Sequence, residues 1–208
     1  DTATTEIYTL SLHDSLPIYF LGSLSSSIIL SKAKYLVDIR SKGSGNAGAT
    51  NMARVLGLGA GLLTLGGDLL KTAISGLIGT LLAGRLGMVI ACGACLVGHC
   101  WPIYYRFKGG KGVSVAVCIA LLLDWRMLLT LAVVFFIFFL FFQRVSLSSV
   151  VCALIYPLVY WRTGAPMDAG FILCCAVTVI VIFAHRSNIR RLIRGEEPRF
   201  TLKKEGKH

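Results

Sequence analysis

Apolar runs alternate with short polar stretches along nearly the whole chain. The runs lie at residues 19–30, 69–83, 86–101, 113–123, 127–142, 147–161 and 167–184. Most are shorter than the roughly 20 residues that a helix needs to cross a hydrocarbon core of about 30 Å, so the helices must extend into flanking residues or the bilayer must thin locally. The pattern predicts an all-α integral membrane protein, a bundle of about seven short transmembrane helices. The fallback is five, if 113–142 forms fewer crossings.

Composition supports a membrane protein and weakens other classes. Hydrophobic residues make up 55% of the chain, charged residues only 15%, and the mean hydropathy is +0.74. The net charge of +11 suggests nucleic acid in a soluble protein, but here the basic residues crowd the ends of apolar runs. Positive-inside topology and anionic lipid explain that placement better. We therefore expect the lipid bilayer as a partner, and no nucleic acid.

The basic residues also predict an orientation. With seven spans, 17 of the 21 Lys and Arg residues fall on one side, in 31–54, 103–112, 143–146 and the tail 185–208, and three fall on the other, Arg85, Arg126 and Arg162. Since cytoplasmic loops carry the excess of Lys and Arg, the C-terminus is predicted to be cytoplasmic and the N-terminus outside.

The start of the chain fits the rest poorly. Residues 1–18 are Thr-rich and lack both an initiator Met and the basic start of a signal peptide, and 6–18 resembles the conceptual translation of a sequencing adapter. We expect a non-native N-terminal segment over 1–18, a membrane domain over 19–198 and a basic cytoplasmic tail over 199–208.

The seven cysteines all lie in apolar runs, which favours packing over chemistry. Cys92 and Cys95 form a lone Cys-x-x-Cys with no second pair and no His at ligand spacing. No metal site is predicted.

A first polar island covers 43–51, with Arg54 just after it. Its three glycines free the backbone to turn around a ligand, while the other residues offer hydrogen bonds and a positive guanidinium fork: Ser44, Asn46, Thr50, Asn51 and Arg54. This is the chemistry of a small anion site. Taken alone, the island also fits a Gly-rich turn between two helices.

A second island covers 106–112. Lys108 and Lys111 flank the Gly109–Gly110 step and precede an apolar run, so backbone N–H groups and two ammonium groups can converge on a phosphate at a helix N-terminus. It is not a Walker A loop, because Gly112 stands where Ser or Thr is required. The alternative is a positive-inside loop.

A third island covers 185–195. As a helix, it places His185 and Asn188 on one face, while its arginines spread over the headgroup side. A basic membrane-proximal tail is the alternative, but it leaves His185 and Asn188 unexplained. A nearby patch at 143–148, which includes Ser146, adds hydroxyl donors on the same side of the membrane.

Asp68 and Lys71 follow a Gly-rich stretch, 56–67. If a helix began at Leu56, a rise of about 1.5 Å per residue would carry Asp68 about 18 Å deep, where charge is costly. We therefore expect 56–67 near the cytoplasmic interface, with Asp68 and Lys71 opening the span and pairing at i, i+3. His99 is either a ligand or a helix-end hydrogen-bonding residue.

Taken together, these motifs resemble the PlsY family of bacterial membrane glycerol-3-phosphate acyltransferases, which use acyl phosphate as donor. The resemblance covers about 19–198 in order and at family spacing, on three motifs: 43–54 with Asp68 and Lys71, 98–112, and 185–197. It implies acyl transfer from acyl phosphate to the 1-hydroxyl of sn-glycerol 3-phosphate, which gives 1-acylglycerol 3-phosphate and phosphate in phospholipid synthesis. It implies no cofactor and no acyl-enzyme intermediate.

The resemblance also assigns roles and a location. Catalytic roles fall to His185, Asn188 and Ser44, and phosphate binding to Ser44, Asn46, Arg54, Lys108, Gly109, Gly110 and Lys111. Thr50, Asn51, Asp68, Lys71, His99 and Ser146 are expected to support the site. The base is either His185 or the donor's own phosphate. The expected location is the bacterial inner membrane, multi-pass, with the active site facing the cytoplasm and a soluble acyl-phosphate-producing enzyme as a possible partner.

Two other classes remain for comparison. An acyl-CoA acyltransferase needs His-x-x-x-x-Asp, but Tyr104 and Arg190 stand five residues after His99 and His185. An organophosphate transporter is expected to show repeat symmetry and polar residues near mid-membrane, which the sequence lacks beyond Asp68 and Lys71.

Overall fold

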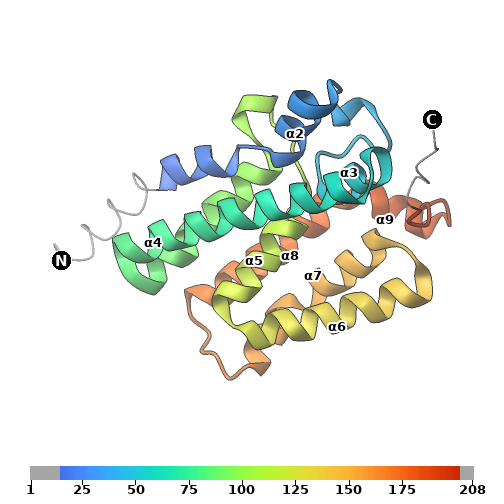
Figure 1. The fold of residues 1–208 in the computed structure, drawn as a ribbon. Helices are drawn as coiled ribbons and strands as arrows, with labels where there is room; N and C mark the ends of the chain where they lie inside the picture. The colour runs from blue at the N-terminus through green and yellow to red at the C-terminus, as the bar shows by residue number, and fades with distance from the viewer. Residues whose placement is uncertain (1–14, 202–208) are drawn as a thin grey trace.

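The computed structural model describes residues 15–201, and the regular elements in that range are all helical. A helical stretch at 15–22 comes first (Figure 1). The labelled elements are α2 (Ser26–Tyr35), η1 (Ile39–Ser41), α3 (Ala49–Leu56), α4 (Leu58–Cys100), η2 (Ile103–Tyr105), α5 (Val113–Leu123), α6 (Trp125–Phe142), α7 (Val145–Arg162), α8 (Ala169–Ala184) and α9 (Arg186–Ile193).

The main hydrophobic core lies between α4, α5, α6, α7 and α8. Leu96, Ile119, Met127, Tyr160 and Val177 are fully buried there. The outward faces are also apolar: in α6 the exposed side chains include Val133, Phe136, Leu140 and Phe141. A soluble protein rarely exposes such a continuous apolar surface, so these faces fit contact with lipid. The expectation of an all-α integral membrane protein is confirmed.

Helix α4 is two helices joined by a sharp break. Ala83 and Gly84 leave the helical conformation, and Gly84 has φ +58°, which favours glycine. Gly79 and Gly87 face each other across the break so closely that a Cβ on either would collide with the backbone of the other. The second half therefore packs back along the first. Two of the predicted apolar runs, 69–83 and 86–101, correspond to these halves.

Helix length and composition alone do not confirm seven spans. Four helical stretches are long and apolar enough to cross a membrane: Ser15–Tyr35, Leu58–Tyr105, Trp125–Phe142 and Val145–Arg162. A fifth results if Ala169–Ala184 and Arg186–Ile193, which meet at a bend of 61°, count as one broken span. The lower count arises because the halves of α4 are merged and α5, an apolar helix, is short. The short α5 is in line with the reason for the fallback of five, namely fewer crossings within 113–142, whereas the merging of the α4 halves was not foreseen.

The expected start of the helix at Asp68 is wrong. Helix α4 begins ten residues earlier, at Leu58, and Asp68 is 1% exposed inside the bundle. The cost of burying this carboxylate is offset by hydrogen bonds from Ser26 and Ser114 and by the ion pair with Lys71, which is 3.5 Å long. Pairing of Asp68 with Lys71 at i, i+3 is therefore confirmed.

The polar islands gather at one end of the bundle. Figure 1 shows α3, α9 and the turn between α6 and α7 at that end, and the bend of α4 and the turn between α7 and α8 at the other. At the far end, Arg85 donates hydrogen bonds to Asp168 and Tyr160, and Tyr160 also donates to Asp168. These contacts fix the bend of α4 to the start of α8.

Candidate active site

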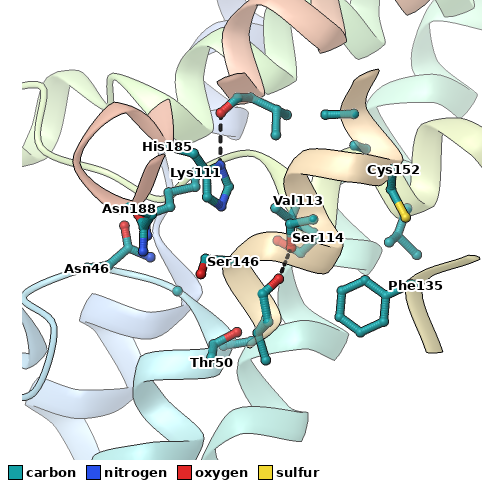
Figure 2. Close-up of a pocket in the computed structure, with 18 of the residues that line it drawn as sticks. Asn46, Thr50, Lys111, Val113, Ser114, Phe135, Ser146, Cys152, His185 and Asn188 are labelled. Atoms are coloured by element: carbon teal, nitrogen blue, oxygen red, sulfur yellow. Dashed lines mark hydrogen bonds between the residues drawn. The ribbon is translucent and has the colours of Figure 1, made fainter. Parts of the chain in front are cut away.

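A cavity of about 460 Å³ lies where the polar islands meet the helical bundle. One part of its lining is polar and comes from α3 with its preceding loop, the start of α5, the start of α7, and α9. The other part is an apolar trough formed mainly by α5, α6 and α7, with Val117, Leu131, Phe135, Cys152 and Tyr156 among its residues. Figure 2 shows Phe135 and Cys152 on the apolar side and Asn46, Lys111, His185 and Asn188 grouped on the polar side.

Asn51 shapes the first island and takes no part in the open surface of its loop. Its buried amide donates to the carbonyls of Ile39, Lys42 and Asn46, and its Oδ1 accepts from the backbone N–H of Ser44 at 2.9 Å. Nearly all of the hydrogen-bonding capacity of the Asn51 side chain is used within the protein. Asn51 therefore holds the loop together through these hydrogen bonds.

Other polar groups of the first island remain available to a ligand. The side chains of Ser44, Asn46, Thr50 and Arg54 line the cavity and form no hydrogen bond or ion pair with any residue in 15–201. A guanidinium placed beside hydroxyl and amide donors, with no carboxylate to neutralise it, is well suited to an anion.

The second island divides between cavity and surface. Lys111 lines the cavity, but Lys108 is exposed and lies outside its lining. Gly110 packs against the ring of His99 and the carbonyl of Ala47, and its N–H donates to the carbonyl of His99 at 3.1 Å. Gly109 is equally close to the end of α4. In the structure, both glycines hold the loop against α4.

The third island contacts the second directly. Lys111 Nζ donates to Asn188 Oδ1 at 2.5 Å, and Asn188 Nδ2 donates to Glu197 at 2.6 Å. The same carboxylate accepts from Ser146 at 2.6 Å and from Arg191 at 2.7 Å. Glu197 thus joins α7, α9 and, through Asn188, the loop before α5. The amide of Asn188 is fixed in orientation by its two partners.

Charges at this end perturb each other. Burial lowers the pKa of the Lys111 ammonium to about 8, an effect that Arg191 and Arg54 reinforce and Glu197 opposes. Burial alone would raise the pKa of the Glu197 carboxyl, but the hydrogen bonds from Ser146, Asn188 and Arg191 hold it below its usual value. An excess of positive charge therefore faces the cavity.

His185 sits at the bend between α8 and α9 and is 3% exposed. Its Nδ1 lies 2.8 Å from the carbonyl oxygen of Val181. Because a carbonyl only accepts, Nδ1 must carry the hydrogen, and in the neutral ring Nε2 then has a free lone pair. This ring lines the cavity, so the lone pair is a candidate proton acceptor.

Asp68 and Lys71 lie behind the cavity and do not line it. His99 lines the cavity and also contacts this pair. Lys71 Nζ is 3.1 Å from His99 Nδ1, and Ser114, which lines the cavity, donates to Asp68 at 2.8 Å. The pair therefore contacts the cavity wall through His99 and Ser114.

Sequence reasoning left three residues out of the site. Glu197 was noted within the third motif but given no role, and Ser114 and Arg191 were passed over. The adjacent pair Glu196–Glu197 in a tail with eight basic residues was a usable signal, since acids there need a reason. Ser114 carries no such signal, because only the packing of α5 on α4 brings it to Asp68.

The geometry suits an amphipathic anion. A polar end with unpaired donors can hold the charged part, a trough with apolar walls can take a hydrocarbon chain, and His185 offers a basic nitrogen on the polar side. Within residues 15–201, no three His, Cys, Asp or Glu side chains are close enough together to hold a metal ion.

Comparison with known proteins agrees with this geometry. Residues 15–195 match the family described as glycerol-3-phosphate acyltransferase. The glycerol-3-phosphate acyltransferases of Finegoldia magna and Syntrophotalea carbinolica are 41% and 40% identical to this chain, over 86% and 89% of it and 90% and 95% of their own lengths.

Solved structures show the same architecture. The crystal structure of PlsY (YgiH), an integral membrane glycerol 3-phosphate acyltransferase, superposes in its glycerol 3-phosphate form with a TM-score of 0.85 at 33% identity, and covers 92% of this chain and 96% of that one. The lysophosphatidic acid form gives 0.83 at 31% identity, with coverage of 92% and 95%. The chain belongs to the glycerol-3-phosphate acyltransferase family, whose members are membrane enzymes of phospholipid synthesis.

Proposed function

We propose that this enzyme transfers an acyl group from acyl phosphate to the 1-hydroxyl of sn-glycerol 3-phosphate, releasing 1-acyl-sn-glycerol 3-phosphate and inorganic phosphate. One observation carries the proposal: a single cavity joins unpaired phosphate-binding groups to an apolar trough. Both substrates are phosphate anions and one has a lipid tail, so both parts of the cavity are used.

The proposed reaction needs no enzyme nucleophile. The 1-hydroxyl oxygen attacks the carbonyl carbon, and the bond from that carbon to the phosphate oxygen breaks, so phosphate leaves with the electron pair. An acyl phosphate is already an activated mixed anhydride, and positioning together with charge neutralisation therefore suffices. The hydroxyl proton goes either to His185 Nε2 or to a phosphate oxygen of the donor.

Residue roles follow from placement. Ser44, Asn46, Arg54 and Lys111 hold the phosphates, with Ser44 close to the reacting atoms. Asn188, whose amide is fixed by Lys111 and Glu197, orients glycerol 3-phosphate beside His185. Lys108, Gly109 and Gly110 are proposed to complete phosphate binding from the loop that carries Lys111. Thr50 and Ser146 add hydroxyls at the rim of the site.

The proposed setting is the inner membrane of a bacterium. Seven crossings place the N-terminus outside and the polar end of the bundle in the cytoplasm, on the side where 17 of the 21 basic residues lie. Glycerol 3-phosphate then arrives from the cytosol. A soluble enzyme that makes acyl phosphate is proposed to deliver the donor to the same face.

Donor competition tests the proposal directly. Purified protein in detergent is incubated with radiolabelled glycerol 3-phosphate and either palmitoyl phosphate or palmitoyl-CoA, and lipid products are separated. We expect labelled lysophosphatidate only with palmitoyl phosphate. Product formed from palmitoyl-CoA alone would overturn the donor assignment and leave the family assignment intact.

The identity of the base has its own test. The His185→Gln variant is assayed with palmitoyl phosphate, and Asn188→Ala serves as a comparison that removes a positioning group. A fall in kcat of about 100-fold or more, as expected for loss of general-base catalysis, assigns the proton to His185. Appreciable turnover in His185→Gln assigns it to the donor phosphate.

A further inference from the structure

His99 is a buried residue that lines the cavity. One of its ring nitrogens has a hydrogen-bond partner within residues 15–201, and the other has none there. The residue is 4% exposed, and its Nδ1 lies 3.1 Å from Lys71 Nζ. Its Nε2 has no hydrogen-bond partner among residues 15–201, although the ring lines the cavity. An unpaired polar atom at a cavity wall is available to a ligand.

The contacts of Lys71 decide which nitrogen of His99 carries the hydrogen. An ammonium group has three donors and no acceptor. Lys71 Nζ meets three acceptors: the carbonyl of Gly22 at 2.9 Å, the carbonyl of Leu24 at 2.8 Å and His99 Nδ1. Both carbonyls lie at the break in the helix before α2. Since every proton on Nζ has a partner, Nδ1 must be the acceptor.

Asp68 pairs with Lys71 and does not compete for His99. Its carboxylate lies 3.5 Å from Lys71 Nζ, and its two oxygens accept from Ser26 at 3.0 Å and from Ser114 at 2.8 Å. The separation of 3.7 Å from Asp68 to His99 Nδ1 is too long for a hydrogen bond. The carboxylate therefore holds the Lys71 side chain in the position from which it donates to His99.

We propose that His99 presents Nε2–H to the cavity as a fixed donor to a phosphate oxygen of a bound substrate, and that Lys71 and Asp68 are positioning residues which hold this tautomer. The inference rests on the proposed function only in taking the ligand to be one of the two phosphate substrates. The two histidines of the cavity then have opposite roles: His185 Nε2 accepts a proton and His99 Nε2 donates a hydrogen bond.

Gly110 supports this assignment from the other side. A Cβ on Gly110 would collide with Nε2 of His99 and would also lie 3.0 Å from the carbonyl oxygen of Ala47. Glycine at this position allows the second island to lie directly against the ring. The loop that carries Lys111 and the donor of His99 are thereby brought to the same wall of the cavity.

Two substitutions at position 99 separate the contribution of Nδ1 from that of Nε2. In His99→Asn the side-chain oxygen takes the place of Nδ1 and still accepts from Lys71, but no donor reaches the cavity. In His99→Gln the amide nitrogen takes the place of Nε2 and restores the donor, while Lys71 loses its acceptor. The two variants are measured for kcat, KM and thermal unfolding in the same detergent.

We expect His99→Asn to unfold near the wild-type temperature and to lose about 10- to 100-fold in kcat/KM, the usual effect of removing a hydrogen bond to a charged group. We expect His99→Gln to unfold earlier and to stay within about fivefold of wild type in kcat/KM, because the donor is kept. The reverse order of activity, or equal loss in both, would overturn the donor role.

Nuclear magnetic resonance reads the tautomer without any assay. In protein labelled with ¹⁵N-histidine, the two ring nitrogens of His99 are assigned by their absence in His99→Asn. We expect an unprotonated Nδ1 and a protonated Nε2, and a shift towards a mixture in Lys71→Met. A protonated Nδ1 in the wild type would overturn the proposal, and so would an unchanged tautomer in Lys71→Met.

Separate measurements with each substrate keep the test of His99 independent of the test of the acyl donor. Glycerol 3-phosphate binding is measured by calorimetry on wild type and His99→Asn without any acyl donor, and KM for palmitoyl phosphate is measured by turnover. Weaker glycerol 3-phosphate binding in His99→Asn assigns the contact to the acceptor substrate, and a raised KM for palmitoyl phosphate assigns it to the donor. If wild type fails to use palmitoyl phosphate, the proposed function falls, but the tautomer and the binding result stand.

Discussion

At the scale of single residues, Arg54 is the cation whose role the geometry defines most sharply. Its guanidinium lines the polar end of the cavity and forms no hydrogen bond or ion pair within 15–201. Lysine keeps the charge but lacks the planar fork that grips a phosphate with two parallel bonds. We expect Arg54→Lys to raise KM for a phosphate substrate about tenfold, with a smaller change in kcat.

Steady-state kinetics with each substrate varied in turn checks this expectation. Arg190→Lys is the matched control, because Arg190 is exposed in α9 and lies outside the cavity lining. If Arg54→Lys and Arg190→Lys give the same KM as wild type, the guanidinium does not hold phosphate through its fork.

Lys111 predicts an alkaline limit to activity. Burial lowers its pKa to about 8, so the free enzyme loses this positive charge as the pH rises through that value. Its hydrogen bond to Asn188 is charge-assisted only while the ammonium is protonated, and so weakens when the proton is lost. We therefore expect kcat/KM to fall above about pH 8, and kcat to fall at a higher pH, because bound phosphate favours the charged ammonium.

Replacement of the ammonium tests whether Lys111 is the group that titrates. Arginine stays protonated throughout the range, so Lys111→Arg should move the alkaline limb of kcat/KM upward by at least about one pH unit, even if activity is lower. Lys42→Arg, at an exposed position outside the cavity lining, should leave the limb where it is. An unmoved limb in Lys111→Arg assigns the titration to another group.

At the scale of elements, α6 and α7 form a wall of the trough. Both helices place some side chains in it and the rest outward: on α7, Cys152 lines the cavity, while Leu154 is 59% exposed and does not. A trough that holds an acyl chain must be sensitive to volume on its inner face and tolerant on its outer face.

A bulky side chain in the trough should therefore change chain-length preference. We expect Cys152→Trp to lower kcat/KM for palmitoyl phosphate about tenfold more than for a donor of eight carbons, because overpacking penalises the longer chain most. Leu154→Trp is the matched control on the same helix. Equal loss for both donors in Cys152→Trp would show that the chain does not lie beside this residue.

At the scale of the whole molecule, the sequence predicted what depends on pattern. Apolar runs located helices: the predicted run 69–83 lies within α4, 127–142 lies within α6 and 147–161 lies within α7. The three islands were expected on one side, and contacts such as Lys111 to Asn188 and Glu197 to Ser146 bring the second, the third and the nearby patch together.

What the sequence missed depends on pairing across the bundle. An early start of α4 was rejected because a charge at Asp68 is costly inside a membrane, but the hydroxyls of Ser26 and Ser114 and the ion pair with Lys71 offset that cost. The opposite tautomers of His99 and His185 cannot be predicted from the sequence either, because they depend on contacts with Lys71 and with the carbonyl of Val181. Local pattern predicts elements, whereas charge satisfaction requires the assembled fold.

The orientation of the molecule gives the last prediction. The end with the cavity includes loops rich in Lys and Arg, and the opposite end has the Arg85–Asp168–Tyr160 contacts and fewer basic residues. The proposed topology of seven crossings would place the cavity end in the cytoplasm. Lys42→Cys lies in an exposed loop at the cavity end, and Met167→Cys lies at the opposite end, where Met167 is 71% exposed.

Labelling of these two variants in intact bacterial cells with a membrane-impermeant maleimide tests the orientation, and the unsubstituted chain gives the background from its native cysteines. We expect Met167→Cys to react from outside and Lys42→Cys to react only after the membrane is opened, because the proposed topology places Met167 in the periplasm and Lys42 in the cytosol. Reaction of both from outside would place the two ends on the same side and exclude an odd number of crossings between them. The reverse pattern would put the cavity outside, where cytosolic glycerol 3-phosphate could not reach it.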